Sequence, residues 1–366
     1  MLMSASVVTA VLMLLLLVPH VALAQRIPNE ADALAEGEKA LEDQRFGDAL
    51  EAFTKATTIA PQYASLWFGK GLSAFMLGQS QVAETSLTQA LKLNPRFGEA
   101  LVLLGELQFQ GGRVTEAIAT YEAALKYAPR DRALIERLDQ LRRDSRFSER
   151  LYQSRGSHFR VLFAGPADEA IARRAVEFLE AAYWRVGSAL SVHPTGPITV
   201  VLYTIEQFHD ITRAPAWAGG LYDGQIRAAV KGVLEHLDDL ERLLVHEYVH
   251  ALVAQVGGQN VPYWLNEGLA TSMEPGGVEW ASSVVVRSRR HVGLDQLHQS
   301  FTRLDDGDVT LAYAESALAV RRLIDRCGAP ALVTLLRDLK RGARFETAFH
   351  QRAAMRYEDF LAMLQR

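Results

Sequence analysis

A proline recurs every 34 residues in the first third of the chain, at Pro61, Pro95 and Pro129. Small and large apolar residues recur in the same register, at Ala49, Ala83, Ala117, Ala56, Ala90, Ala124, Gly37, Gly71, Gly105, Phe53, Leu87 and Tyr121. Such self-similarity is typical of a solenoid, in which each unit buries its apolar face against its neighbour. Each unit is predicted to be two short helices, with small residues where the helices cross and proline where the second helix ends.

The period and register resemble those of the tetratricopeptide repeat. Three units are expected at residues 30–63, 64–97 and 98–131, within a domain that spans residues 25–146. The resemblance implies an all-α solenoid whose concave surface binds peptides or proteins, although a solenoid of this size also suits holding a neighbouring domain in place. A further helix at residues 132–144 is expected to cap the open end of the stack, because a terminal unit would otherwise expose an apolar face. The repeat indicates a scaffold and is no evidence of chemistry.

Residues 1–24 have the layout of a secretory signal peptide. An apolar run at residues 7–18 is followed by Pro19 and then by the small-residue pattern Ala22-Leu23-Ala24. The run is short for a membrane span, which needs about 20 apolar residues. Cleavage after Ala24 is therefore expected, and with it a periplasmic or extracellular protein. A membrane-anchored protein is expected only if this segment is retained.

Chain length indicates the number of domains, and charge limits the kinds of binding partner. A chain of 366 residues is too long for one small core and predicts at least two domains. Its 49% apolar and 22% charged residues are typical of a folded protein. The formal net charge is −4 and no block of Lys and Arg stands out, which argues against nucleic acid as a partner.

The pattern changes in the second domain, expected at residues 147–366. Two strands are predicted at residues 158–165 and 197–204, with a helix at residues 167–190 between them. A glycine-rich turn and an extended segment follow at residues 218–231, and the chain reads as helical from residue 237 onward. A small sheet followed by helices predicts an α+β arrangement for this domain.

The pentapeptide HEYVH lies within an apolar helix that is expected at residues 237–258. His246 and His250 are four residues apart, so both imidazoles project from one face and can reach one ion at about 2.0–2.1 Å. Glu247 lies at the edge of that face, where a base can meet a water molecule without displacing a ligand. Burying these three polar groups is costly unless something pairs with them. This favours a metal site over a helix whose histidines are core groups bonded to backbone.

A second helix is predicted at residues 263–273, after a turn-forming segment at residues 257–262. Glu267 lies in the middle of this helix, seventeen residues after His250. A catalytic zinc ion takes three protein ligands and keeps one position open. Glu267 is therefore the candidate third ligand, the alternative being a polar residue on an ordinary helix.

HEYVH followed by WLNEGLA is similar to the gluzincin metallopeptidases, which have a thermolysin-like core, and the resemblance covers residues 158–366. It implies that His246, His250 and Glu267 bind one zinc ion per chain and that Glu247 is the general base of peptide hydrolysis. A downstream helix at residues 311–324 resembles the family's tyrosine helix. Tyr313 is then a candidate to hydrogen-bond the oxyanion, although a packed or exposed aromatic residue also explains it.

Two departures from the family pattern bear on the site. Thermolysin-like enzymes often place an aspartate four residues after the ligand glutamate, where this chain has Thr271. A hydrogen-bond partner for a ligand histidine must then come from elsewhere. Residues 217–224 also lack the carboxylate run with which the aminopeptidase branch holds a substrate amine, which favours an endopeptidase.

The sequence thus predicts an exported zinc peptidase that hydrolyses peptide bonds, with an edge strand near residues 220–231 that pairs with an extended substrate. Its repeats are expected to recruit the protein substrate or a partner. The alternative is a non-catalytic exported tetratricopeptide adaptor with an inactive zinc-binding domain. The intact His246, Glu247, His250 and Glu267 favour the peptidase, because an inactive domain has no need to keep Glu247.

Overall fold

The computed structural model describes residues 28–364, apart from residues 149, 195, 215–217, 231–235, 259, 289, 295–296, 299, 302–303 and 305. The predicted signal segment, residues 1–24, lies outside the described residues. The chain divides into two compact units between Glu149 and Arg150, whereas the sequence placed the boundary at residue 146. No helix among the described residues is both long enough and apolar enough to span a bilayer.

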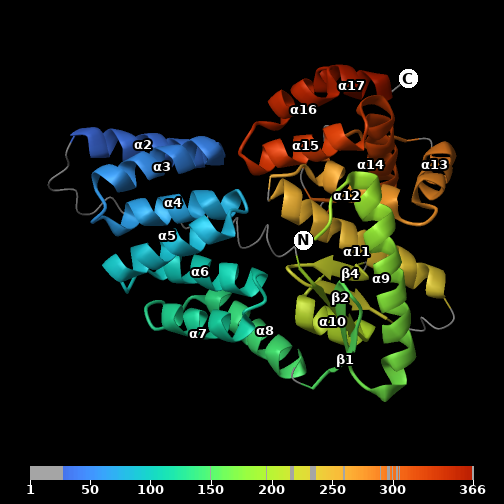
Figure 1. The fold of residues 1–366 in the computed structure, drawn as a ribbon, viewed down its shortest axis with the longest axis horizontal. Helices are drawn as coiled ribbons and strands as arrows, with labels where there is room; N and C mark the ends of the chain where they lie inside the picture. Colours follow the sequence, from blue (N-terminus) through green and yellow to red (C-terminus); the bar gives the residue numbers. More distant parts are fainter. Residues whose placement is uncertain are drawn as a thin grey trace. The chain divides into compact units, whose positions relative to one another are not determined.

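The first unit is an all-α solenoid of paired helices, as the repeat predicted (Figure 1). The pairs are α2 (Pro28–Glu42) with α3 (Phe46–Ile59), α4 (Ala64–Met76) with α5 (Ser80–Leu93), and α6 (Gly98–Gln110) with α7 (Val114–Leu125). Helix α8 (Arg132–Ser148) follows and packs on α7. The recurrent prolines each come shortly after the second helix of a pair ends.

A glycine in the first helix of each pair admits a large side chain from the second helix. A Cβ atom on any of the three glycines would lie 2.8–2.9 Å from a side-chain carbon of its partner, which no real Cβ tolerates. The partners are Gly37 with Phe53, Gly71 with Leu87, and Gly105 with Tyr121. The 34-residue register is therefore a packing requirement, repeated once for each helix pair.

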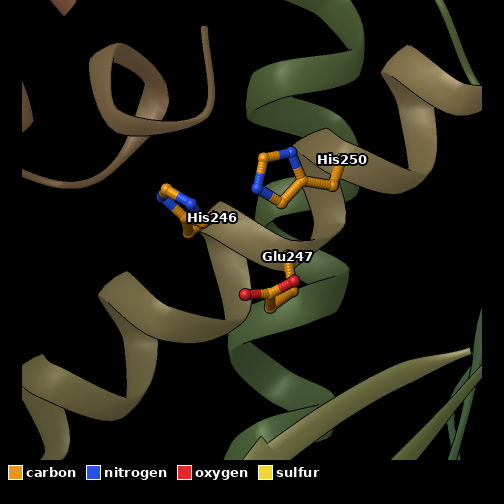
Figure 2. A group of neighbouring side chains, drawn as sticks. All are labelled: His246, Glu247 and His250. Atoms are coloured by element: carbon orange, nitrogen blue, oxygen red, sulfur yellow. The ribbon is translucent and has the colours of Figure 1, made fainter. Parts of the chain in front are cut away.

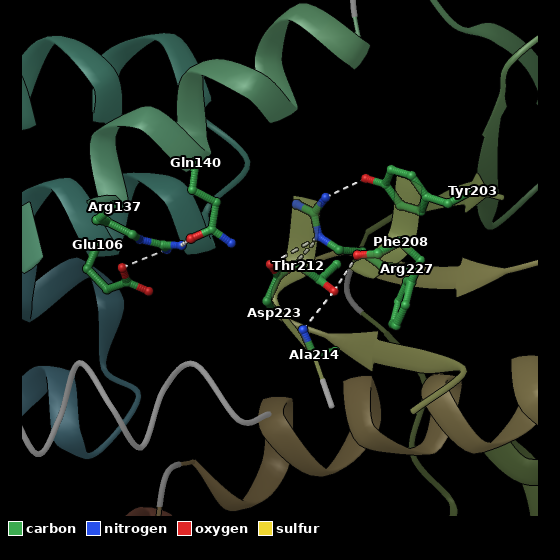
Figure 3. A network of polar contacts seen from close by, with 9 residues as sticks. All are labelled: Glu106, Arg137, Gln140, Tyr203, Phe208, Thr212, Ala214, Asp223 and Arg227. Atoms are coloured by element: carbon green, nitrogen blue, oxygen red, sulfur yellow. Dashed lines mark hydrogen bonds and ion pairs between the residues drawn. The ribbon is translucent and has the colours of Figure 1, made fainter. Parts of the chain in front are cut away.

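A buried ion pair ties α8 to the last helix pair (Figure 3). Arg137 Nη2 donates to Glu106 Oε2 at 2.9 Å, and the Tyr121 hydroxyl donates to the same oxygen at 3.0 Å. The side chains of Arg137 and Glu106 are only 9% and 8% exposed. The guanidinium also lies over the Phe109 ring, 4.5 Å from its centroid. Helices α6, α7 and α8 thus share one polar contact inside an apolar stack.

The second unit contains a five-stranded sheet in the order β1-β2-β3-β5-β4. Strands β2 (Phe159–Phe163), β3 (Ile198–Tyr203) and β5 (Ile226–Ala229) are parallel, and β1 (Tyr152–Arg155) and β4 (Gly220–Tyr222) add to the two edges as antiparallel strands. The 3₁₀ turn η1 (Pro166–Asp168) and α9 (Glu169–Leu190) connect β2 to β3. The predicted α+β class is confirmed, although the sequence pattern does not predict β1.

Helices cover both faces of this sheet. Helices α9 and α11 (Leu237–Gly257) pack on one face, where Val161, Val200 and Ile226 are fully buried. Helix α10 (Ile205–Thr212) packs on β3 and β5. Helix α10 is also not among the predicted elements, although its first turn carries a capping box in which Thr204 and Gln207 exchange hydrogen bonds.

A buried arginine fixes the hairpin that β4 and β5 form (Figure 3). Arg227 on β5 is 2% exposed, and its Nε donates to both carboxylate oxygens of Asp223 at 3.0–3.1 Å. Its Nη1 donates to the Tyr203 hydroxyl at 2.5 Å. The turn of the hairpin is therefore tied to the end of β3, which restrains the edge strand β4.

The rest of the unit is helical, with α12 (Tyr263–Met273), α13 (Gly277–Arg287), α14 (Asp306–Cys327), α15 (Ala329–Lys340), α16 (Phe345–Ala353) and α17 (Tyr357–Leu364). Helices α12 and α14 approach each other closely at Gly268. A Cβ atom there would lie 2.3 Å from the backbone oxygen of Ser316. Glycine is thus required for this approach, because a backbone oxygen cannot move aside as a flexible side chain does.

Replacing Arg137 by methionine keeps much of its apolar contact but leaves Glu106 buried without its cation. We expect the free energy of unfolding of the repeat unit to fall by up to about 3–5 kcal/mol. Hydrogen exchange on the full chain, followed by mass spectrometry, will show this loss as faster exchange in α6, α7 and α8.

The Arg142→Met variant is the control for this experiment. Arg142 lies on the same helix, is 41% exposed and pairs with Glu122 at 2.7 Å. An exposed pair contributes about 1 kcal/mol or less, so exchange in α6 to α8 should change little. Equal acceleration in both variants would show that the buried pair has no special role.

Candidate metal centre

Helix α11 is buried along most of its length, as its apolar sequence predicted. Leu244, Val245, Tyr248 and Val249 are fully buried in the core of the second unit. The helix ends at Gly257, and the next residue, Gly258, has a positive φ of 68° that favours glycine. Any polar side chain that α11 turns inward is therefore surrounded by apolar groups and needs a partner.

Three such side chains lie together on α11. Potential ligand atoms of His246, Glu247 and His250 are within 4.8 Å of one another. Figure 2 shows both imidazoles on the same side of α11, with the Glu247 carboxylate beside them. The ring centroids of the two histidines are 4.7 Å apart. The structure thus brings together the two predicted ligands and the predicted base.

Glu267 reaches the same place from α12. Its Oε2 atom lies 3.3 Å from His246 Nε2 and 3.4 Å from His250 Nε2. Donor atoms that bind one tetrahedral ion at about 2.0–2.1 Å are about 3.3–3.4 Å apart, so these distances fit shared coordination. The neighbouring residues Leu265 and Leu269 are fully buried and hold α12 in the core. The third predicted ligand is therefore adjacent to the first two.

Electrostatic pairing compensates for the burial of these groups. Burial acts to lower the pKa of His246, but hydrogen bonds to Glu267 and Glu274 hold that pKa well above its ordinary value. Burial acts to raise the pKa of Glu267, but the imidazoles of His250 and His246 hold it well below its ordinary value. The carboxylate is thus kept ionised, which is the state in which it binds a cation.

Glu247 has a different environment from Glu267. Its side chain is buried, and no hydrogen-bond partner for Oε2 is present among the described residues. Burial raises the pKa of this carboxyl above its ordinary value. A Cβ atom on Gly220 would lie 2.5 Å from Glu247 Oε1, so the backbone of β4 passes directly beside the carboxylate. Glu247 therefore has one oxygen against the sheet edge and a second, buried oxygen that bonds none of the described residues.

The outer nitrogen of each histidine is held by a residue that the sequence reading had not singled out. His246 Nδ1 is hydrogen-bonded to Glu274 Oε1 at 2.7 Å, and His250 Nδ1 to Asn266 Oδ1 at 3.1 Å. These bonds direct both Nε2 atoms towards Glu267 Oε2. Thr271, the position where the family often has aspartate, makes no such bond, and its Oγ1 has no partner among the described residues.

The position of Glu274 in the sequence explains how it reaches His246. Glu274 caps the C-terminal end of α12, seven residues after Glu267, which is about two helical turns. A carboxylate that lies about one turn beyond the family position therefore holds His246. Arg242 Nε, on α11, lies 3.8 Å from the other oxygen of Glu274.

Tyr313 also lies at this site, as the resemblance implied. Its ring centroid is 6.1 Å from that of His246, and the nearby Glu267 carboxylate helps to raise the pKa of its hydroxyl. Tyr263, which the sequence analysis does not single out, also interacts with this carboxylate. Burial raises the pKa of both phenols well above their ordinary value, so both remain protonated donors at neutral pH.

These residues fit a zinc ion or a similar first-row cation. The donor atoms are two imidazole nitrogens and one carboxylate oxygen, which is the set found in catalytic zinc sites of the thermolysin type. The two bonds to Nδ1 leave each Nε2 free to bind a metal. Three protein ligands leave one position of a tetrahedral ion for water or substrate.

Replacing Glu274 by glutamine tests how His246 is held. The neutral amide orients His246 Nδ1 less strongly, so the affinity for zinc should fall about 10–100-fold while the fold is retained. Competition with a chelator of known affinity measures the change. Glu279→Gln is the matched control, because Glu279 is exposed on α13 and should leave zinc affinity unchanged. Normal zinc affinity in Glu274→Gln would mean that Glu274 does not tune the site.

Comparison with known proteins agrees with this description. Residues 180–358 match the Peptidase MA superfamily, and residues 34–81 and 68–132 match the tetratricopeptide repeat. The small glutamine-rich tetratricopeptide repeat-containing protein 2 of Mycosarcoma maydis is 35% identical over 101 residues. That match covers 27% of this chain and 28% of the relative, so the chain spans less than a third of that protein.

Solved tetratricopeptide domains resemble the first unit more distantly. The Sgt2 domain from Aspergillus fumigatus is 21% identical, with a TM-score of 0.32, and the match covers 34% of this chain and 83% of that domain. The Arabidopsis OM64 domain is 20% identical, with a TM-score of 0.31, over 32% of this chain and 96% of that domain. From the family matches, the chain carries a Peptidase MA superfamily domain that follows a run of tetratricopeptide repeats.

Proposed function

We propose that this chain is a zinc-dependent peptidase that hydrolyses internal peptide bonds of a protein substrate. The observation that carries the proposal is the convergence of His246, His250 and Glu267 beside the buried Glu247, directly under a sheet edge. We further propose that the protein is exported, because its N-terminal segment has the sequence of a signal peptide. One zinc ion per chain is expected.

The residues of the chain account for the proton transfers that hydrolysis needs. Zinc, when bound by the three ligands, supplies a Lewis acid that polarises the scissile carbonyl and acidifies water. Glu247 accepts a proton from the attacking water and then delivers it to the leaving nitrogen. Its raised pKa suits this task, because a stronger base accepts the proton more readily. Tyr313 donates a hydrogen bond to the developing oxyanion.

Strand β4 offers backbone groups to an extended substrate. The Ala229 amide donates to Gly219 O at 2.8 Å, and the Asp223 amide donates to Gln225 O at 3.2 Å. Pairs of this antiparallel ladder alternate, so the N–H and C=O groups of Gly220 and Tyr222 face away from β5. Strand β4 lies at the edge of the sheet of described strands. A substrate strand that pairs with Gly220 therefore lies beside Glu247.

The repeats are proposed to bind a segment of the substrate protein or of a partner protein. A solenoid with paired helices presents an extended concave surface, and such surfaces suit peptide segments. Binding by the repeats raises the effective concentration of a tethered substrate at the peptidase unit.

The first test is the zinc content of the mature protein and of its Glu267→Ala variant. We expect about one zinc ion per chain in the wild type and much less in the variant, because a two-histidine site binds zinc weakly. Elemental analysis after dialysis measures both. Equal zinc in the two proteins would remove Glu267 from the site, and no zinc in either would favour a non-catalytic adaptor.

The second test separates catalysis from metal binding. Glu247→Gln removes the base while all three ligands stay, so zinc should be retained and cleavage of fluorescein-labelled casein should fall about 10²–10⁴-fold. Glu241→Gln, which lies on the same helix and outside the site, should leave the cleavage rate unchanged. Equal rates in wild type and Glu247→Gln would show that Glu247 is not the general base.

A third test addresses the position of β4. In Gly220→Ala the new Cβ atom would lie 2.5 Å from Glu247 Oε1 and 2.8 Å from Leu243 Cδ1, so the carboxylate must move. We expect kcat/KM to fall about 10²-fold with zinc content unchanged, because a displacement near 1 Å misaligns the base. Gly219→Ala is the control, since its Cβ atom would meet Leu243 only at 3.8 Å. Similar rates in the two variants would argue against close passage of β4 by Glu247.

A further inference from the structure

Glu267 is contacted by two tyrosines as well as by the two histidines. Tyr263 lies four residues before Glu267 on α12, so both side chains project from the same face of that helix. Tyr313 comes from α14, which packs on α12. Each hydroxyl interacts with the Glu267 carboxylate, and this interaction adds to burial in raising the pKa of both phenols. Glu267, the third proposed ligand, is thus restrained by tyrosines on two different helices, α12 and α14.

One buried phenylalanine restrains both tyrosine rings. Phe301 is fully buried, just before α14 begins. The Tyr263 ring packs on it edge to face, with centroids 4.7 Å apart and an interplanar angle of 69°. The Tyr313 ring does the same at 5.2 Å and 89°. Because both rings lean on the same residue, the two hydroxyls are held in a fixed relation to each other.

The two hydroxyls differ in their other surroundings. The Tyr263 hydroxyl is also hydrogen-bonded to Ser300, the neighbour of Phe301, so it is held between Ser300 and Glu267. The Tyr313 ring instead lies beside His246, the more exposed of the two histidines, whose side chain is 14% exposed against 7% for His250. Tyr313 therefore lies on the His246 side of the site, and Tyr263 lies on the Ser300 side.

We propose that Tyr263 is a positioning residue for Glu267, whose hydroxyl, anchored by Ser300, directs the carboxylate towards the Nε2 atoms of His246 and His250. Tyr313 remains the tyrosine that meets the substrate. This assignment rests on the proposed zinc peptidase function. It predicts that the Tyr263 hydroxyl acts first on metal binding, whereas the Tyr313 hydroxyl acts first on turnover.

The test compares Tyr263→Phe, Tyr313→Phe and Tyr357→Phe in the full chain, because each change removes one hydroxyl and keeps the ring. Zinc affinity is measured by chelator competition, the ligand field by the visible absorption of the Co²⁺ form, and kcat and KM with fluorescein-labelled casein. Tyr357 is the control, since its hydroxyl is hydrogen-bonded to His298 at 3.1 Å.

For Tyr263→Phe we expect zinc affinity to fall at least about tenfold and the Co²⁺ bands to shift. For Tyr313→Phe we expect a larger fall in kcat and a smaller change in zinc affinity, and for Tyr357→Phe no change. Unaltered zinc affinity and Co²⁺ spectrum in Tyr263→Phe would overturn the inference, as would a greater loss of affinity in Tyr313→Phe. If the wild type binds neither Zn²⁺ nor Co²⁺, the proposed function fails as well, which distinguishes the two failures.

Discussion

The second unit depends on how two histidines and two glutamates are accommodated inside an apolar core. His250 and Glu267 are buried and the side chains of His246 and Glu274 are only 14% exposed, so an unpaired charge there would be very costly. These groups pair with one another. Glu267 Oε2 lies next to the Nε2 atoms of both imidazoles, and Glu274 and Asn266 are hydrogen-bonded to the two Nδ1 atoms. Helices α11 and α12 must therefore keep their separation and rotation, because a shift of either would leave several polar groups unpaired at once.

The sheet adds a second constraint on α11, through its edge strand β4. Glu247 is pressed against the backbone of β4 at Gly220, and β4 is in turn held by the hairpin that the buried Arg227 anchors to Asp223 and Tyr203. A chain of fixed contacts thus runs from the interior of the sheet to the carboxylate of the proposed base. This explains why a fully buried arginine, which is expensive to desolvate, stands in a strand of only four residues.

Much of the fold and of the candidate site could be predicted where the residues involved are close together in sequence. The repeat register follows from Gly71 facing Leu87 in one helix pair, and the helical spacing of His246 and His250 places them on one face. Glu274 and Tyr263 escaped prediction because their roles depend on where α12 ends and on how α14 and the segment around Phe301 pack on it. Strand β1 escaped because its polar residues are mostly exposed, so it carries no clear alternation of apolar and polar positions. The capping box of α10 was readable, but the helix is only two turns long.

Glycines set the distances between helices in both units. In the second unit, one such glycine also affects the proposed metal site. Gly268 follows Glu267 directly and lets α12 approach the backbone of α14 at Ser316. Tyr313 lies three residues before Ser316, less than one helical turn away, so the same approach brings its hydroxyl to the Glu267 carboxylate. A larger residue at position 268 would push α14 outward and take Tyr313 with it, even though neither helix would lose its apolar face. Gly268, the glycine in WLNEGLA, therefore matters for the proposed function because it sets the spacing of α12 and α14. It does so without itself contacting a metal or a substrate.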